Sequence, residues 1–176
     1  MKKTGFFLIV AFFLISCQFS RKNYTVKNDR EWIGQKINIP DGIVFKALGK
    51  DTLYSDIWDK PYKIFTYIDS AGCTSCQMHL PEWKAIIRLC HQQHIDVGFI
   101  FAVHSSNFKH FEEGILASYF DYPIIYDFHN RFEKMNHFPP VPNRTFLLDK
   151  ENRILLVGSP INNSKVWELY KKQFVK

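Results

Sequence analysis

The alternation of hydrophobic and polar positions along the chain predicts strands that alternate with helices. Two long apolar runs, at residues 62–68 and 95–103, predict buried strands, and apolar residues at helical spacing over 74–94 predict a helix between them. Beyond the second strand the pattern predicts helices at 108–119, 129–136 and 164–174 and short strands at 123–126, 145–148 and 154–157. This order predicts an α/β fold with a mixed central sheet flanked by helices.

Local features refine the predicted elements. Pro81 should kink the helix over 74–94, because a proline in a helix interior lacks the N–H that the helix needs. Ser164 should cap the last helix through its side-chain oxygen. Ahead of the first long strand, residues 32–39 and 43–48 are expected to be short strands or extended entry segments. The two long strands should be central, since both of their faces must be covered.

The amino terminus has the pattern of an export signal. Lys2 and Lys3 precede an unbroken apolar run over residues 5–15, which is too short for a membrane span of about 20 residues. The run ends at Ser16-Cys17, which resembles a bacterial lipobox, in which the cysteine is lipidated and starts the mature chain. An ordinary signal peptide with a chance cysteine is the alternative. The predicted organisation is a lipoprotein signal peptide, a lipidated Cys17 with a flexible tether, and one domain: residues 1–16, 17–30 and 31–176.

Composition and charge narrow the range of functions. Aromatic residues make up 16% of the chain, enough for a sizeable core in one domain. The net charge is +6, but basic and acidic residues are mixed and no basic run lies beside interleaved aromatics, so nucleic acid is not expected as a partner. Export would place a lipid-anchored protein in the bacterial cell envelope, facing the periplasm, where disulfides persist.

The candidate chemistry is the thiol pair of Cys73-Thr74-Ser75-Cys76, which lies between the first long strand and the predicted helix. Backbone N–H groups and the dipole at a helix start stabilise a thiolate, so Cys73 is the predicted nucleophile. Cys76, one turn later, is the predicted resolving thiol, which closes a redox-active Cys73–Cys76 disulfide. A permanent structural disulfide is the alternative.

Simpler roles are expected for the other candidate groups. Cys90 lies on the apolar face of the predicted helix and is expected to be a small core residue. His104 follows the second long strand at its carboxyl end, where a plain loop histidine is expected and a proton relay near the thiols is the alternative. A metal site of Cys73, Cys76 and His79 would lack a fourth ligand, and covalent haem attachment would need a histidine directly after Cys76. No metal or other cofactor is therefore predicted.

The motif and the order of elements resemble thioredoxin-fold proteins, and more narrowly the membrane-tethered periplasmic thiol–disulfide reductases of bacteria. Residues 72–77 and the lipobox also resemble thioredoxin-like lipoproteins of the Bacteroidetes. Further points of resemblance are Pro81 five residues after Cys76, the strand at 122–127 with its short helix, and the strand pair that begins at residue 145. The resemblance covers about 34–174 and implies a thioredoxin fold with an extra strand–helix insertion before the closing β-hairpin and C-terminal helix.

The same resemblance implies a function. It implies a thiol–disulfide oxidoreductase, acting as a reductase on disulfide-bearing exported proteins and itself reduced by an upstream dithiol protein. Thr74 and Ser75, between the cysteines, would tune the reduction potential. Thioredoxins place a cis-proline just before the strand that faces the disulfide. Here Pro142 lies about one residue too early for that place in the groove, and Asn143 or Arg144 falls there instead. If Arg144 occupies that place, its charge lies near Cys73 and should favour the thiolate.

Two departures from the thioredoxin pattern keep other functions open. Tyr67 stands where thioredoxins carry a buried acid, six residues before Cys73. Together with the place of Pro142, it favours a non-enzymatic thioredoxin-fold binding lipoprotein with a structural Cys73–Cys76 disulfide as the alternative function. A peroxidase of the peroxiredoxin type is a further alternative, although Thr66 stands where that pattern has a proline.

Overall fold

The computed structural model describes residues 29–69, 78–138 and 143–175. The chain divides into two compact units, Met1–Glu31 and Trp32–Lys176. Only residues 29–31 of the first unit are described, so the predicted signal peptide, Cys17 and most of the tether lie outside the described residues. Among the residues that the structure describes, no helix is both long enough and apolar enough to cross a membrane.

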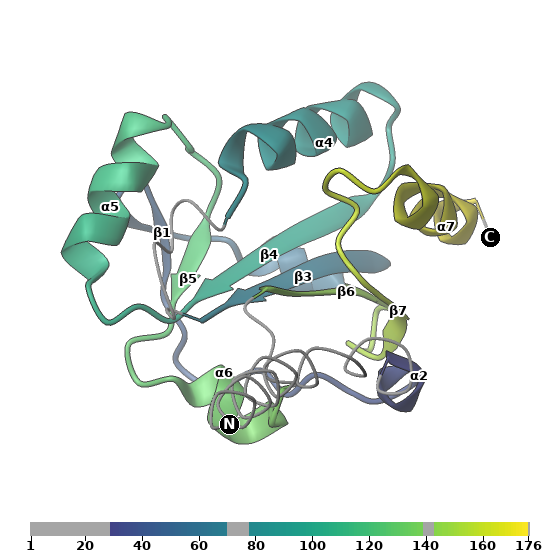
Figure 1. Cartoon of the computed structure of the whole chain (residues 1–176), viewed down its shortest axis with the longest axis horizontal. Coiled ribbons are helices and arrows are strands. Elements are labelled where there is room, and N and C mark those ends of the chain that lie inside the picture. Colours follow the sequence, from purple (N-terminus) through teal and green to yellow (C-terminus); the bar gives the residue numbers. More distant parts are fainter. Residues whose placement is uncertain (1–28, 70–77, 139–142, 176) are drawn as a thin grey trace, which may run out of the picture. The chain divides into compact units, whose positions relative to one another are not determined.

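The described part of the second unit is built on one seven-stranded sheet (Figure 1). The strands are β1 (Phe45–Ala47), β2 (Lys50–Thr52), β3 (Tyr62–Ile68), β4 (Val97–Val103), β5 (Ile124–Tyr126), β6 (Asn143–Leu148) and β7 (Ile154–Val157). Their order is β2-β1-β5-β4-β3-β6-β7. The neighbours β3, β4 and β5 pair in parallel, and the remaining pairs are antiparallel. The predicted α/β fold with a mixed sheet is confirmed.

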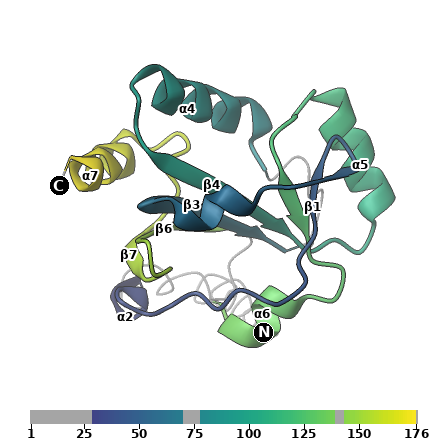
Figure 2. The ribbon, with the colours of Figure 1, turned by 180° about the vertical axis from the view of Figure 1, so that it is seen from behind.

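Helices cover both faces of this sheet. They are the 3-10 helix η1 (Ser55–Asp59) and the α-helices α4 (Leu80–Gln92), α5 (Phe108–Ala117), α6 (Arg131–Asn136) and α7 (Ser164–Phe174), while a short helix α2 (Asp29–Trp32) lies at the boundary of the two units. α4, α5 and α7 lie over one face and α6 over the other, as Figures 1 and 2 show from opposite sides. β5 and α6 provide the extra strand and helix that the sequence predicts before the hairpin of β6 and β7.

β3 and β4 form the buried centre of the sheet. Every residue of β4 is buried, as is every residue of β3 after its first. Successive side chains of a strand face opposite ways, so Ile64 and Ile68 pack in the core cluster that includes residues of α4, α5 and α7. Phe65 and Tyr67 pack in the other cluster, which includes Phe132 of α6. The prediction that the two long strands are central is confirmed.

Two predicted helix details are wrong. Within the described part of the predicted helix over 74–94, α4 begins only at Leu80, after His79 in the left-handed conformation with φ of 50°. Pro81 therefore lies in the first turn, where a missing N–H costs nothing, and it does not kink the helix. Asn163 caps α7, because its side chain accepts a hydrogen bond from the N–H of Val166 at 3.2 Å; Ser164 is the first residue of this helix.

The segment ahead of β3 contains more structure than its sequence pattern predicts. β1 lies within the predicted 43–48, but residues 32–39 show only the end of α2 and an isolated bridge between Lys36 and Arg153. The pattern missed β2 and η1. β2 is Lys50-Asp51-Thr52, whose polar residues carry no alternation of the kind that predicts a strand.

Candidate functional site

The carboxyl ends of the three parallel strands lie side by side at one edge of the sheet. The N–H of His104 donates to the carbonyl oxygen of Ile68 at 2.9 Å, and the N–H of Asp127 donates to that of Val103 at 2.8 Å. β6 starts at the same edge, since it runs antiparallel to β3. Open α/β sheets bind ligands outside the carboxyl ends of their strands. We call this edge the carboxyl edge and define it by Asp69, His104, Asp127 and Arg144.

The chain between β3 and α4 carries the predicted thiols. The predicted site residues that lie outside the described residues are Cys73, Thr74, Ser75, Cys76 and Pro142. The flanking residues are described: Asp69 follows β3 at the carboxyl edge, and Met78, just before α4, is fully buried. Cys73 follows Asp69 by four residues, and four residues of extended chain span at most about 14 Å. Covalent geometry therefore keeps Cys73 within that reach of the carboxyl edge.

Tyr67 occupies the position of the buried acid of thioredoxins. Its side chain is fully buried, and its hydroxyl donates a hydrogen bond to Oδ1 of Asn130, just before α6. Burial raises the pKa of this phenol far above its usual range, and neighbouring negative charges raise it further. These charges belong to Asp127, Asp69 and Glu133. Tyr67 is therefore a neutral hydrogen-bond donor near neutral pH.

Arg144 and Glu133 form a largely buried ion pair beside Tyr67. Nη1 of Arg144 lies 3.3 Å from Oε2 of Glu133, and the arginine side chain is only 5% exposed. The guanidinium also lies over the rings of Tyr67 and Phe138, with 5.5 and 5.8 Å to the two ring centroids. The structure thus surrounds Arg144 with a carboxylate and two aromatic rings. The effect of its charge on Cys73 stays a prediction.

His104 is oriented by the end of β5. Its Nδ1 lies 2.9 Å from the carbonyl oxygen of Asp127, and because a carbonyl only accepts, Nδ1 carries the hydrogen. In the neutral ring Nε2 is then the acceptor. The structure places His104 at the carboxyl edge beside the end of β3, as its place in the sequence predicts; a proton relay to the thiols stays a prediction.

Comparison with known proteins identifies the architecture around this edge. No family model matches the chain, and no curated protein matches its sequence. The thioredoxin domain of a thiol-disulfide oxidoreductase from Bacteroides vulgatus is 13% identical, with a TM-score of 0.58 over 81% of this chain and 97% of that one. The chain has the thioredoxin fold.

Two further solved structures share the thioredoxin fold with this chain. A thiol:disulfide interchange protein from Bacteroides sp. is 11% identical, with a TM-score of 0.56 over 81% of this chain and 91% of that one. StoA from Bacillus subtilis is 20% identical, with a TM-score of 0.51 over 71% of this chain and 94% of that one. The thioredoxin fold that the sequence resemblance implies is therefore confirmed. Along the chain, β3 comes first, the two cysteines follow, and α4 comes next, which is the order on which the resemblance is based.

Cys90 belongs to the core of this thioredoxin fold. Its side chain is fully buried on α4, in the cluster that also holds Trp83 and Phe101. Burial raises the pKa of the Cys90 thiol to about 11, so this thiol is neutral and unreactive near neutral pH. The prediction of a small core residue is confirmed.

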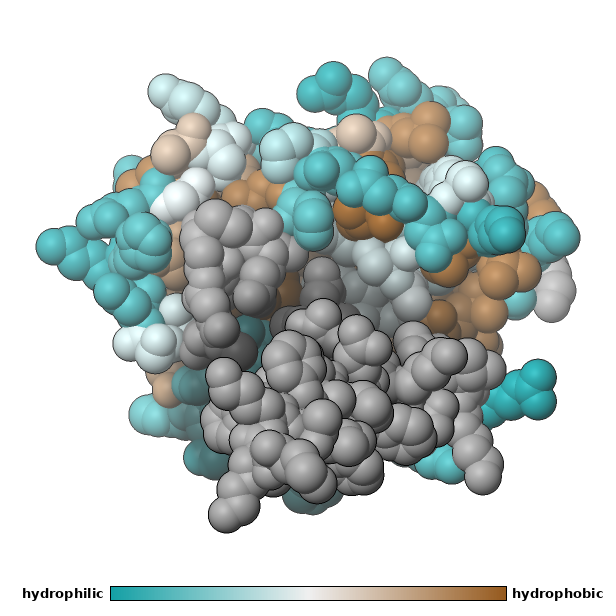
Figure 3. Space-filling view, viewed as in Figure 1, coloured by the Kyte–Doolittle hydropathy of each residue, from teal (hydrophilic) through white to brown (hydrophobic). Residues whose placement is uncertain are grey.

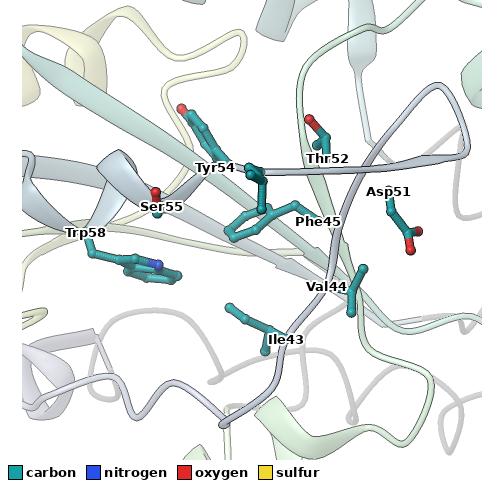
Figure 4. Close-up of a pocket in the computed structure, with 9 residues that line it drawn as sticks. Ile43, Val44, Phe45, Asp51, Thr52, Tyr54, Ser55 and Trp58 are labelled. Atoms are coloured by element: carbon teal, nitrogen blue, oxygen red, sulfur yellow. The ribbon is translucent and has the colours of Figure 1, made fainter.

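Two surface pockets lie apart from the carboxyl-edge residues. One, of about 470 Å³, lies over β1, β2 and η1, where Figure 4 shows Phe45, Tyr54 and Trp58 among its lining residues. The other, of about 490 Å³, lies between α4 and the start of α7, where Figure 3 shows hydrophobic side chains among polar ones. Neither pocket is lined by a residue that defines the carboxyl edge.

Three residues beside Tyr67 are missed by sequence reasoning. Asp127 holds the start of α6, since its carboxylate accepts hydrogen bonds from the N–H groups of Arg131 and Phe132 at 2.8 and 2.9 Å. An aspartate ahead of a predicted helix is a capping signal that identifies this role. Asn130 and Glu133 carry no such signal in the sequence. They contact residues that are distant along the chain: Asn130 accepts from Tyr67 of β3, and Glu133 pairs with Arg144 of β6.

Proposed function

We propose that the protein is a thiol–disulfide oxidoreductase that reduces disulfides of exported proteins through Cys73 and Cys76. The observation that carries the proposal is the place of Cys73-Thr74-Ser75-Cys76 in the chain, between β3 and α4 of a thioredoxin fold. A thiol near the carboxyl edge would be accessible to a partner protein, because open α/β sheets bind their ligands outside the carboxyl ends of the strands. Structural neighbours that are named as a thiol-disulfide oxidoreductase and an interchange protein support the proposal.

The proposed cycle consists of two thiol–disulfide exchanges. The Cys73 thiolate attacks one sulfur of a partner disulfide, so that a mixed disulfide forms and the other partner sulfur leaves as a thiolate. Cys76 then attacks the Cys73 sulfur, which releases the second partner thiolate and closes the Cys73–Cys76 disulfide. The partner gains two electrons and two protons, and the pair loses them. A dithiol donor protein returns the electrons by the same chemistry, so the cycle needs no bound cofactor.

The proposed setting is the cell envelope. Cleavage before Cys17 and its lipidation would anchor the domain in a membrane, facing the periplasm, where exported proteins carry disulfides. The support is the sequence pattern of residues 1–17. Labelling with palmitate followed by membrane fractionation tests this: Cys17→Ala should lose both label and membrane association, and a variant that keeps both would refute the anchor.

Insulin reduction with a dithiol donor tests the enzymatic proposal. Wild-type protein should accelerate reduction, Cys73→Ser should abolish the acceleration, and Cys76→Ser should stop turnover and accumulate mixed disulfides. Cys90→Ala is the matched control, because Cys90 is a buried core thiol, and it should keep the activity. Equal rates for wild type and Cys73→Ser would reject the proposal.

A non-enzymatic binding protein is the second candidate function. The buried phenol of Tyr67, at the position of the acid of thioredoxins, favours it, since this phenol stays neutral near neutral pH and provides no carboxylate at that position. In that case Cys73 and Cys76 would form a permanent disulfide, and the wild type would capture partners without reducing them. Capture that survives Cys73→Ser, together with no insulin reduction, would support this function.

A further inference from the structure

An exposed aromatic ring lies next to the carboxyl edge, and the proposed thiol cycle makes no use of it. The ring belongs to Phe128, which is 52% exposed although it directly follows the buried Asp127. It lies against the ring of Phe108, the first residue of α5, with 4.6 Å between the ring centroids. Charged residues adjoin both rings. We call this surface the Phe128 patch and define it by Phe108, Lys109, Phe128, His129 and Lys134.

The exposed ring is supported by a group of aromatic residues that reaches into the core. Phe108 stacks on Tyr126 of β5 with 5.2 Å between the centroids, and Phe128 lies 5.9 Å from the same ring. Phe111 of α5 is edge-on to Tyr126 at 5.4 Å, and both of these residues are buried. Because these contacts already hold Phe128, a partner that covers its ring immobilises little further motion. Aromatic residues of this kind are frequent hot spots of protein interfaces.

The charged side chains of the Phe128 patch are cationic. Nζ of Lys134 donates to the carbonyl oxygen of His129 at 2.9 Å, which brings the amine close to Phe128. Lys109 is exposed and directly follows Phe108. Among the residues that the structure describes, neither lysine forms a salt bridge with an acid. Both amines are therefore available to carboxylates of a partner.

Most acidic residues near the patch are already engaged. The carboxylate of Asp127 is buried and accepts two N–H groups of α6. Glu133 pairs with Arg144, and Glu113 lies 3.6 Å from the ring of its neighbour on α5, His110. Burial raises the pKa of Tyr126 and the charge of Glu112 raises it further, so Glu112 is the one remaining acid near the aromatic group in this part of the described chain. The two lysines outweigh it, and the patch keeps an excess of positive charge.

We propose that the Phe128 patch is a docking site for an acidic segment of a partner protein. An apolar side chain of that segment packs on Phe128, while its carboxylates lie near Lys109 and Lys134. The packed ring provides affinity, and the complementary charges select the partner and speed the encounter. The inference rests on the proposed function for the identity of the partner, a disulfide-bearing exported protein. It adds the chemistry of the segment by which such a partner binds.

A protein segment fits the Phe128 patch better than a bilayer surface does. Interfacial binding to a membrane uses a helix with a broad apolar face. Here α6 has only six residues, and Phe128 is the only ring of the patch that is more than half exposed. The position of Phe128 directly after Asp127 also favours a protein, because partners of open α/β sheets bind at the carboxyl ends of the strands.

Fluorescence anisotropy of three labelled peptides tests the docking site in the full chain. The peptides contain no cysteine and carry one phenylalanine flanked by aspartates, by asparagines or by lysines. The aspartate peptide should bind the wild type most tightly, and its affinity should fall as salt is added, since salt screens exposed charges. Phe128→Ser should weaken this binding about tenfold. The double variant Lys109→Glu with Lys134→Glu should prefer the lysine peptide.

Matched controls come from α7, which lies on the opposite side of the sheet's width from α5 (Figures 1 and 2). Leu169→Ser removes an apolar side chain that is 46% exposed, and Lys172→Gln removes an exposed cation. Neither should change the affinity for the aspartate peptide. Circular dichroism identifies variants that fail to fold; if Phe128→Ser is one of them, the double lysine variant decides the outcome.

The results distinguish the docking site from the proposed function. Equal binding of the three peptides, an unchanged affinity in Phe128→Ser, or a double lysine variant that still prefers the aspartate peptide would overturn the docking site, even in a protein that reduces insulin. Protection of residues 126–135 from hydrogen exchange by phosphatidylglycerol vesicles, without peptide binding, would assign the patch to a membrane and also overturn it. Selective binding of the aspartate peptide by a protein that reduces no insulin would reject the proposed function and leave the docking site standing, because these peptides contain no thiol.

Discussion

The two ends of β3 each bury a cation on the same face of the sheet, but they stabilise it in different ways. At the amino end, Lys63 is fully buried and its Nζ donates to the carbonyl oxygens of Lys150 and Lys60 at 2.9 and 3.4 Å. At the carboxyl end, Arg144 lies against ionisable Glu133 and two aromatic rings. Lys63 uses partners whose charge never changes, whereas the partner of Arg144 can gain or lose a proton.

This difference indicates which end is structural and which can respond to its surroundings. The contacts of Lys63 join the turn between β6 and β7 to the start of β3, and their acceptors are neutral carbonyl groups that do not titrate. The contact of Arg144 depends on two charges, and it lies at the edge that leads to the proposed thiols. Four substitutions test this contrast, in order of decreasing expected effect on stability.

Arg144→Met should have the largest effect. Removal of one partner from a buried ion pair costs about 3–5 kcal/mol of the free energy of unfolding, because the other charge is left without compensation. The loss should fall in the lower part of this range, since Glu133 is partly exposed and can take up a proton. Urea unfolding at neutral pH measures it. A loss below that of Lys63→Met would contradict the contrast.

Lys63→Met should have the second largest effect. The substitution leaves the Lys150 carbonyl without its donor, and an unsatisfied buried acceptor costs about 1–3 kcal/mol. Lys60→Met is the control: Lys60 pairs with Asp96 at 2.8 Å on the surface, and exposed pairs contribute about 0–1 kcal/mol. Both free energies of unfolding come from urea titration. Equal losses in the two variants would show that the buried contacts of Lys63 contribute little.

Lys63 also gives this end of β3 a pH dependence of known sign. Burial lowers the pKa of Lys63 below its usual range, so the folded chain releases this proton more readily than the unfolded chain does. Wild-type stability relative to Lys63→Met should therefore rise as pH increases through the lowered folded value toward the ordinary lysine value. A relative stability that falls over this alkaline range would contradict the assignment.

Tyr67→Phe should have a smaller effect than either cation. It removes one hydrogen bond to Asn130 and keeps the ring that lies against Arg144. A neutral hydrogen bond contributes about 0.5–1.5 kcal/mol, so the loss in the free energy of unfolding should fall in this range. Tyr119→Phe is the control, because Tyr119 is 78% exposed. Its free energy of unfolding should not change.

Glu133→Gln should have the smallest effect, because the amide keeps an oxygen beside Arg144 and the guanidinium keeps its contacts with the rings of Tyr67 and Phe138. The effect should be visible as a dependence on pH. The folded state raises the pKa of Glu133, so the contribution of this group to stability is fully present below the unfolded value and is lost as pH rises through the folded value. Thus the stability of Glu133→Gln relative to the wild type should increase from about pH 4 to pH 7. Urea unfolding at several pH values measures the trend, and the opposite trend would show that the ion pair outweighs burial.

The long strands and most helices could be predicted because their sequence patterns reflect burial. β3 and β4 are covered on both faces, so they read as unbroken apolar runs, and the prediction over 62–68 matches the bounds of β3. β2 was missed because its position at the sheet edge leaves Lys50 and Asp51 exposed. Apolar spacing also extended α4 too far toward its start, where His79 adopts a left-handed conformation that spacing does not report.

The candidate site could be predicted only in part. A count from Cys73 identifies Tyr67 as the residue in place of an acid, since this relation is local in sequence. The pairing of Arg144 with Glu133 depends on how α6 packs against β6, and it has no signature along the chain. Sequence reasoning therefore placed the Arg144 charge near Cys73, which stays a prediction, and missed the carboxylate that pairs with it.

The place of β3 between β4 and β6 sets an order for folding. β4 follows β3 closely in the chain, but β6 arrives much later: the hydroxyl oxygens of Thr66 and Thr145 lie 3.2 Å apart across 79 positions. Until that long loop closes, one side of an apolar strand has unpaired backbone groups, which is the kind of edge that recruits other chains. Nascent protein that stops short of β6 should therefore expose an aggregation-prone edge, and closure of the β3–β6 ladder removes that edge.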